Sequence, residues 1–184
     1  INMNIAIVGA TGNVGRKILE VLEKLNFKFN QLYLIASEKS IGKKISFKNK
    51  EYSLVGLNDF DFSKVKIAFF SAGSAIAKEW APIAAKKTII IDNSKYFRMD
   101  KDITLIVPEV NPESLGQYKN KNIIANPNCS TIQLVLALKP LHDQFKIKRV
   151  VTSTYQSVSG GGKNHMMELE VQTKSVLENK KVKS

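Results

Sequence analysis

A glycine-rich segment close to the N-terminus constrains the fold of this 184-residue chain more than any other feature. Residues 9–15 carry glycine at every third position and directly follow an apolar run, residues 4–8. Apolar side chains then recur at helical spacing through residues 13–25. Glycines so spaced permit a tight turn, a close approach of a ligand to the backbone and close packing of the helix. The segment predicts a strand–turn–helix unit that binds the pyrophosphate of a dinucleotide.

Short β-rich runs alternate with helical patterns along the chain that follows. Runs that are apolar throughout indicate strands buried on both faces, and their alternation with helices predicts an α/β fold with a doubly wound, mostly parallel sheet. The expected strands are residues 4–8, 31–36, 66–71, 88–92, 104–107 and 122–125. Besides residues 13–25, a helix is expected at 75–86, where Pro82 either kinks it or splits it. Residues 41–56 are interpreted as a small antiparallel excursion between crossovers.

The composition changes after the single cysteine, Cys129. Residues 132–141 are apolar nearly all round, which is typical of a helix buried between layers. Residues 148–157 predict a long strand and residues 164–177 a further helix, which together are too little for an independent core. We therefore expect a complete first domain at 1–130 and the opening of an interrupted second domain at 131–184.

Charge and composition exclude several classes of protein. The net charge is +12, but only three of the 28 basic residues are arginines, and the lysines are scattered without interleaved aromatic residues, so we expect no nucleic-acid partner. No apolar run approaches the roughly 20 residues of a membrane span, and no signal peptide is expected at the N-terminus. A lone cysteine fits a reducing compartment. We expect a cytoplasmic protein without a membrane partner or a metal site.

The end of the second expected strand bears on the choice between NAD and NADP. An acidic residue there suits the ribose hydroxyls of NAD, whereas hydroxyl and basic groups suit the 2′-phosphate of NADP. Ser37, Lys39 and Ser40 offer three contacts to phosphate oxygens against the one carboxylate of Glu38. The segment favours NADP, with Glu38 turned outward; an exposed polar loop is the alternative.

The segment around Cys129 predicts a nucleophile. Pro127 fixes the backbone just before the cysteine, and an apolar helix is expected directly after it. The positive end of a helix dipole favours the thiolate form of a cysteine, and the same amides, with the side chain of Asn128, are placed to stabilise an oxyanion. A lone cysteine is more often a small buried apolar residue, but its neighbours in a dinucleotide-binding chain favour catalysis.

The sequence Asn-Pro-Asn-Cys-Ser-Thr-Ile at residues 126–132 is similar to the catalytic-cysteine motif of aspartate-semialdehyde dehydrogenases. Further matches to this family, in order, are residues 9–15, 71–74, 92–98, 107–111 and 154–161. The resemblance covers nearly the whole chain. It implies NADPH-dependent reduction of L-aspartyl-4-phosphate to L-aspartate-4-semialdehyde, with release of phosphate, through a cysteine thioester in lysine, threonine and methionine biosynthesis. It also implies a homodimer at full length.

The resemblance assigns roles residue by residue. Arg98 matches the arginine that binds the substrate phosphate, Asn128 assists it, and Gln156 orients the substrate beside the Cys129 sulfur. Lys39 stands where many members have arginine, so its grip on phosphate is a point charge. Three sources together predict the cofactor-binding residues: the glycine-rich segment, the end of the second expected strand and the family resemblance. These residues are Gly9, Thr11, Gly12, Asn13, Val14, Ser37, Lys39, Ser40, Ser71, Gly73, Ser159 and Gly160.

The departures from the family pattern limit what is expected of these residues alone. Family members run to about twice this length, in line with two full domains, and their acid–base histidine, a substrate-carboxylate arginine and a phosphate-holding lysine lie in the other half. His142 and His165 match no such motif and are expected on the surface. We expect a truncated, inactive chain with apolar surface partly uncovered at 132–141 and 150–158. The alternatives are an N-acetyl-glutamyl-phosphate reductase, whose cysteine motif typically reads Asn-Pro-Gly-Cys-Tyr, and an inactive NADP-binding remnant.

Overall fold

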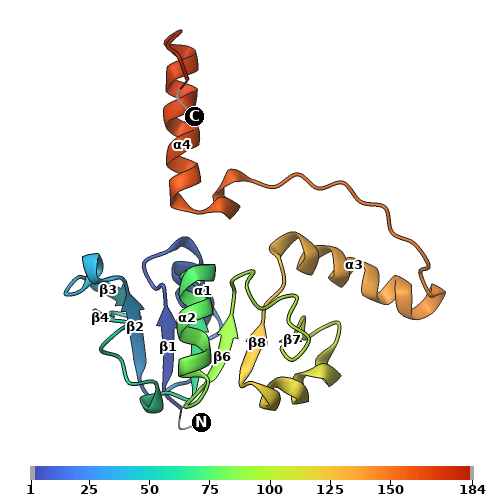
Figure 1. Ribbon diagram of the computed structural model, residues 1–184, viewed down its shortest axis with the longest axis horizontal. Helices are drawn as coiled ribbons and strands as arrows, with labels where there is room; N and C mark the ends of the chain where they lie inside the picture. The colour runs from blue at the N-terminus through green and yellow to red at the C-terminus, as the bar shows by residue number, and fades with distance from the viewer. Residues whose placement is uncertain (1–2, 183–184) are drawn as a thin grey trace. The chain divides into compact units, whose positions relative to one another are not determined.

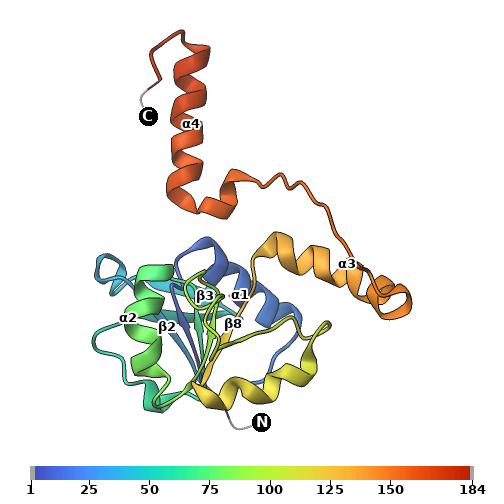
Figure 2. The ribbon, with the colours of Figure 1, turned by 45° about the vertical axis from the view of Figure 1, so that its right-hand side comes forward.

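The computed structural model describes residues 3–182 and has one mixed sheet with strand order β3-β4-β2-β1-β5-β6-β8-β7 (Figure 1 and Figure 2). The strands are β1 (Ile5–Val8), β2 (Leu32–Ala36), β3 (Lys44–Phe47), β4 (Lys50–Gly56), β5 (Ile67–Phe70), β6 (Ile89–Asp92), β7 (Thr104–Leu105) and β8 (Ile123–Ala125). All pairings in the sheet are parallel except that of β3 with β4. The expected doubly wound α/β fold is confirmed.

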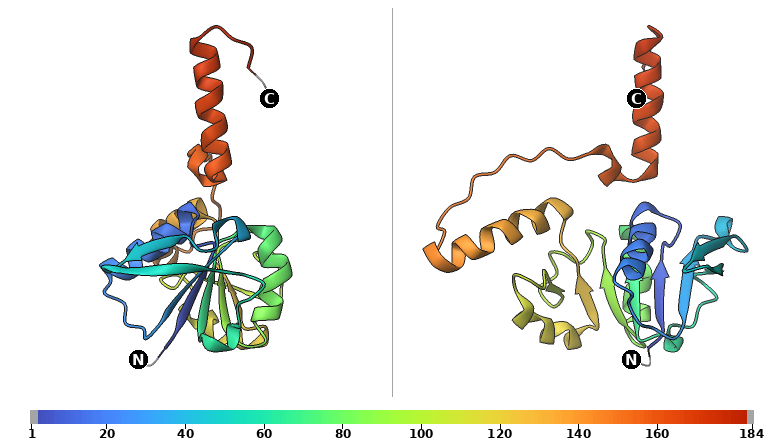
Figure 3. Two further views of the ribbon diagram at one scale, coloured as in Figure 1. Left: turned by 90° about the vertical axis from the view of Figure 1, so that its left-hand side faces the viewer. Right: turned by 180° about the vertical axis from the view of Figure 1, so that it is seen from behind.

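The two faces of the sheet are covered by different helices, α1 (Asn13–Lys24) and α2 (Ser74–Ala84), as the left-hand view of Figure 3 shows. Alternate side chains of β1 serve the two faces: Ile5 and Ile7 pack in one core cluster, and Ala6 and Val8 in the other. The first cluster contains Leu19 and Leu22 of α1, and the second contains three alanines of α2. Burial on both faces explains why these strands are apolar throughout.

The antiparallel excursion expected at residues 41–56 is confirmed: β3 and β4 form a hairpin. In addition, β4 pairs in parallel with β2, with Leu34 opposite Leu54, so the hairpin extends the sheet. Helix α2 is not split at Pro82. Pro82 stands in its last turn, where the missing amide hydrogen removes one hydrogen bond near the helix end.

The described chain divides into two compact units at Lys148 and Arg149. The first unit also contains three 3₁₀ helices, η1 (Glu38–Ser40), η2 (Phe62–Lys64) and η3 (Pro112–Asn120), and it ends with α3 (Cys129–Phe145). The second unit contains η4 (Val158–Gly161) and α4 (Lys163–Leu177), the helix expected at 164–177. None of the helices in residues 3–182 combines the length and the apolar composition needed to cross a bilayer.

Two expectations for residues 129–157 are wrong in this structure. Helix α3 has no buried residue among those described, and Leu141 and Phe145 are 50% and 68% exposed, because the rest of the first unit covers the helix only in part. Residues 148–157 form no strand, because a strand must pair its amides and carbonyls and the described residues supply no partner for them. The partly uncovered apolar surface expected at 132–141 and 150–158 is observed, with Val151 80% exposed.

Candidate functional site

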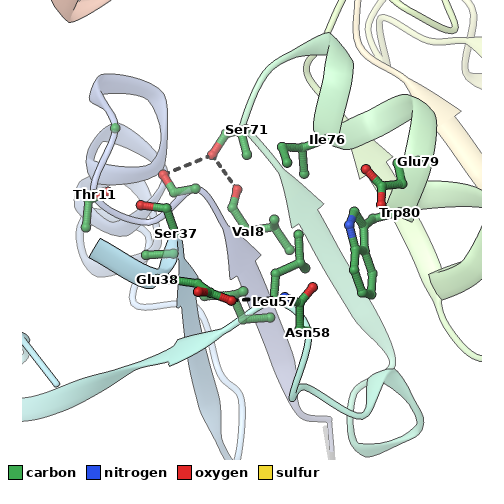
Figure 4. Close-up of a pocket in the computed structure, with 15 residues that line it drawn as sticks. Val8, Thr11, Ser37, Glu38, Leu57, Asn58, Ser71, Ile76, Glu79 and Trp80 are labelled. Carbon is green, nitrogen blue, oxygen red and sulfur yellow. Dashed lines mark hydrogen bonds between the residues drawn. The ribbon is translucent and has the colours of Figure 1, made fainter. Parts of the chain in front are cut away.

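A cavity of about 560 Å³ opens at the carboxyl ends of β1, β2 and β5 (Figure 4). In the sheet order, β2 lies on one side of β1 and β5 on the other, so the cavity lies where the winding direction of the sheet reverses. Open α/β sheets bind their ligands at such a point. The cavity is lined by Val8, Gly9, Thr11, Gly12, Ile35, Ala36, Ser37, Glu38, Leu57, Asn58, Ser71, Ala72, Ile76, Glu79 and Trp80.

The turn between β1 and α1 can be built only with glycine at two positions. Gly9 has a φ of 87°, and a Cβ there would lie 2.7 Å from the carbonyl carbon and oxygen of Ser71. A Cβ on Gly15 would overlap the carbonyl oxygen of Gly9. The absence of a side chain at Gly15 therefore lets the first turn of α1 pack closely against the backbone of the β1–α1 turn. The Ser71 hydroxyl donates to the carbonyl oxygens of Val8 (2.9 Å) and Gly9 (3.4 Å) and braces the turn from β5.

The start of α1 fits the pyrophosphate of a dinucleotide. Gly12 is the N-cap and brings no side chain that would bond to the first amides of the helix. The first turn of α1 contains no acidic residue, so the partial positive charge of the helix N-terminus is not neutralised there. Thr11, Asn13 and Val14 are exposed beside Gly12. The residues present therefore suit an anion at this end of the cavity.

The segment after β2 differs from its expected arrangement. Ser37 and Glu38 line the cavity, and the Glu38 carboxylate accepts a hydrogen bond of 3.0 Å from the side-chain amide of Asn58 (Figure 4). Glu38 is exposed, as expected of a residue turned outward, but it also lines the cavity, because Asn58, which follows β4, orients its carboxylate there. Lys39 is exposed and Ser40 half-buried in η1, and neither is among the lining residues.

The apolar wall of the cavity was not foreseen from the sequence. It contains Ile76 and Trp80 of α2, which are four residues apart and share one helix face, together with Leu57 from the loop after β4. Gly73, a predicted cofactor residue, is the N-cap of α2 with a φ of 88° and is not among the lining residues. The helical spacing of Ile76 and Trp80 was a usable signal, but only the sheet order shows which cavity that face meets.

Cys129 is the first residue of α3 and is exposed, so its expected position at a helix start is confirmed. The N-cap is Asn128, whose Oδ1 accepts a hydrogen bond of 2.9 Å from the amide of Ser130 and lies 4.0 Å from the Cys129 Sγ. Pro127, buried, precedes this cap. The carboxyl end of β8 therefore delivers the thiol directly to the positive end of a helix.

Arg98 is anchored to the segment that leads into Cys129. Its Nε donates to the carbonyl oxygen of Asn126 (2.9 Å), and its Nη2 donates to that of Asn93 (3.2 Å). The Asn126 side-chain amide donates to Asn93 Oδ1 at 2.5 Å, which ties the ends of β6 and β8 together. These bonds use two of the five donors of the guanidinium, so Arg98 is held in place with donor capacity for an anion.

Asp92 has a buried carboxyl that stabilises the turn after β6, the turn that carries Arg98. It is fully buried at the end of β6 and accepts hydrogen bonds from the Ser94 hydroxyl (2.6 Å) and the Ser94 amide (3.1 Å). Burial raises the pKa of the Asp92 carboxyl, and the bonds from Ser94 and the charge of Arg98 oppose the rise. Asp92 therefore stabilises the turn that presents Arg98.

The remaining predicted site residues belong to the second unit. Gln156, Ser159 and Gly160 are exposed, and the Gln156 side chain lies so close to Gly160 that a Cβ there would overlap its amide. The hydroxyls of Ser157 and Ser159 are 2.9 Å apart. His142 on α3 and His165 on α4 are both exposed, as expected. The first unit thus brings together the cavity, Arg98, Asn128 and Cys129, and the second holds Gln156, Ser159 and Gly160.

Two family models match the chain: "Semialdehyde dehydrogenase, NAD binding domain" at residues 4–118, and "Semialdehyde dehydrogenase, dimerisation domain" at residues 138–184. The aspartate-semialdehyde dehydrogenase of Aquifex aeolicus is 55% identical over 180 residues, which are 97% of this chain and 53% of that protein. Aspartate semialdehyde dehydrogenase II of Vibrio cholerae, whose structure was solved with ASA, is 48% identical and superposes with a TM-score of 0.94. The match covers 100% of this chain and 55% of the Vibrio cholerae chain. The chain spans about half the length of the curated relatives it matches.

A more distant structure, the aspartate semialdehyde dehydrogenase of Candida albicans solved with NADP, is 28% identical with a TM-score of 0.64, over 79% of this chain and 48% of its own. The relatives bear out the resemblance carried by residues 126–132 and by the other matching segments.

Proposed function

The chain belongs to the semialdehyde dehydrogenase family, and we propose that it supplies the NADP-binding region and the nucleophile of an aspartate-semialdehyde dehydrogenase. One observation carries the proposal: a cavity suited to a dinucleotide and a cysteine at a helix start lie in the same compact unit. Along the chain, residues 1–130 are proposed to form the cofactor domain and residues 131–184 to begin a dimerisation domain, which the family match at 138–184 supports.

The proposed reaction begins at Cys129. Its thiolate attacks the carbonyl carbon of L-aspartyl-4-phosphate. The bond between this carbon and the phosphate oxygen breaks, phosphate departs, and the acyl group remains bound to Sγ as a thioester. The cofactor, when bound, supplies a hydride. A hydride supplied there would reduce the thioester carbonyl, and cleavage of the carbon–sulfur bond would then give L-aspartate-4-semialdehyde and restore the Cys129 thiolate. Two lower barriers replace one high barrier.

The anchored side chains suit the steps that need charge and position. Arg98, held by Asn93 and Asn126, binds the substrate phosphate and the phosphate that leaves. The first amides of α3, with the Asn128 side chain, stabilise the oxyanion formed at the attacked carbonyl. Gln156 orients the substrate beside the sulfur, a role that rests on the family resemblance. The Vibrio cholerae relative solved with ASA supports a substrate of this class.

The cofactor is proposed to be NADP. The Candida albicans relative solved with NADP supports it, as do the hydroxyl and basic groups of Ser37, Lys39 and Ser40 that follow β2. The start of α1 and the turn at Gly9 hold the pyrophosphate, and Ser159 and Gly160 are assigned to the cofactor by the family resemblance. The complete enzyme is proposed to be a homodimer. It is proposed to act in the biosynthesis of lysine, threonine and methionine.

The reductase that acts on N-acetyl-glutamyl phosphate is the nearest alternative in chemistry. Its motif differs at the two residues that flank the cysteine, where this chain has Asn128 and Ser130. Asn128 Oδ1 caps α3 by accepting from the Ser130 amide, so the residue before the cysteine has a structural function here that glycine does not supply. This observation favours the cysteine motif of the aspartate-semialdehyde dehydrogenases over that of the N-acetyl-glutamyl-phosphate reductases.

Two rates measured on one sample test the proposal. Alkylation of Cys129 near neutral pH is expected to outrun that of a model thiol, because the helix start favours the thiolate. NADPH oxidation with aspartyl phosphate is expected to stay at background, because His142 and His165 are exposed on helices and acid–base help is typically worth about 10²–10⁴-fold. Cys129→Ser is the control for labelling. Slow alkylation contradicts the nucleophile, and appreciable turnover contradicts the need for residues from the relatives' other half.

A further inference from the structure

An exposed acidic side chain, that of Glu38, contributes to the lining of the candidate cofactor cavity. The Glu38 carboxylate accepts a hydrogen bond of 3.0 Å from Asn58 Nδ2, and both residues line the cavity beside Ser37 (Figure 4). Glu38 follows β2, and Asn58 follows the parallel neighbour β4, so two strand ends that are adjacent in the sheet meet here. Glu38 is exposed, and the bond orients its carboxylate at the lining of the cavity.

The position of this carboxylate matters because it follows the second strand of the dinucleotide-binding unit. A carboxylate at that point in such folds accepts hydrogen bonds from the ribose hydroxyls of NAD. A phosphate on the 2′-oxygen replaces a donor by a group with a charge of about −1.5 to −2 at neutral pH, which a carboxylate repels. Ser37 and Lys39 act in the opposite direction, but Lys39 is not among the lining residues.

We propose that Glu38, oriented by Asn58, is a specificity-determining residue that reduces the preference for NADPH, so that the cavity also accepts NADH. This inference rests on the proposed function of the cavity as a nicotinamide dinucleotide site. Asn58 is a positioning residue: its amide carries no charge, and it acts by keeping the Glu38 carboxylate beside the ribose.

The test compares the dissociation constants of NADPH and NADH, measured by isothermal titration calorimetry on the full chain. Glu38→Gln removes the charge and keeps an acceptor for Asn58, and it is expected to raise the NADPH-to-NADH affinity ratio roughly tenfold. Asn58→Ala frees the carboxylate and is expected to shift the ratio in the same direction by a smaller factor. Glu23→Gln removes the same charge from an exposed position near the end of α1, outside the cavity lining, and is expected to leave the ratio nearly unchanged.

The outcomes separate this inference from the proposed function. Binding of both nucleotides, with a ratio that Glu38→Gln does not change or that Glu23→Gln changes equally, overturns the specificity role alone. Binding of neither nucleotide by the wild-type chain overturns the proposed cofactor site, and the specificity role with it. A wild-type chain that binds NADPH and shows no measurable NADH binding also overturns the inference.

Discussion

The two units of the chain differ in what holds their structure. The buried residues of the two core clusters in the described chain lie between Ile5 and Ala125, where two helices pack on opposite faces of the sheet. In α4 of the second unit no described residue is buried, and the helix carries local side-chain pairs, such as Lys174 with Glu170. Such pairs contribute only about 0.2–0.5 kcal/mol each. Tertiary burial therefore fixes the cofactor side of the site, whereas the side-chain pair named in α4 is local to that helix.

The largest expected contrast comes from matched leucine truncations. Leu34 in β2 is 1% exposed and Leu177 at the end of α4 is 77% exposed. Leu34→Ala leaves a cavity in the core and is expected to lower the free energy of unfolding by about 3–5 kcal/mol. Leu177→Ala is expected to cost less than about 0.5 kcal/mol. Urea unfolding of both variants measures the difference, and equal losses would show that α4 shares the core of the sheet.

A second contrast uses two glycines with the same backbone angle. Gly9 and Gly162 both have a φ of 87°, but a Cβ on Gly9 meets the backbone of Ser71, whereas a Cβ on Gly162 meets nothing within 4 Å. Gly9→Ala is expected to cost about 2–4 kcal/mol and to abolish nucleotide binding, because left-handed strain and overpacking add. Gly162→Ala carries the left-handed strain alone, about 1–2 kcal/mol. Calorimetric unfolding with and without NADPH distinguishes them; similar binding by both variants would be incompatible with the turn geometry.

Reversing one charge in each unit tests where the cofactor binds. Lys39→Glu is expected to weaken NADPH binding by about 1–3 kcal/mol through loss of a charge-assisted contact, with less effect on NADH. Lys163→Glu at the start of α4 changes the net charge equally and is expected to leave NADPH binding nearly unchanged. Fluorescence titration with both nucleotides provides the measurement. A loss of the same size in both variants would mean that the overall charge, and not a contact, attracts the nucleotide.

The smallest contrast concerns two serine hydroxyls. The Ser71 hydroxyl is partly buried and bonds to the β1 turn, whereas the Ser159 hydroxyl pairs with Ser157 in an exposed setting. Ser71→Ala is expected to destabilise by about 0.5–1.5 kcal/mol, and Ser159→Ala by nearly nothing. Thermal unfolding of the two variants measures this. An unchanged unfolding temperature in Ser71→Ala would show that the Ser71 hydroxyl does not stabilise the turn between β1 and α1.

The sequence predicted the sheet better than the segments that follow it. Strands β1, β2 and β5 and helix α1 lie within a residue of their expected bounds, because periodicity reflects burial on the sheet. The parallel pairing of β4 with β2 has no local signal. The strand expected at 148–157 and the burial expected for α3 both assumed partners that the described residues do not contain.

The candidate site divides in the same way. The turn at Gly9 and the helix start at Cys129 were predictable because each is encoded by a few consecutive residues. Trp80, Leu57 and Asn58 were missed, and the place of Glu38 in the cavity lining was not foreseen, because these four meet only through the order of the strands. Sequence patterns report local conformation, whereas the walls of a cavity between strands depend on which strands become neighbours.

The central claim is that a nicotinamide dinucleotide binds in the first unit, at the carboxyl ends of β1, β2 and β5. Hydrogen–deuterium exchange of the full chain with and without saturating NADPH tests it most directly, because exchange reports the protection of individual backbone segments. The account predicts slower exchange at residues 9–15, 36–38 and 71–73, which adjoin the cavity. Unchanged exchange in all three segments, under conditions where NADPH is bound, would contradict it.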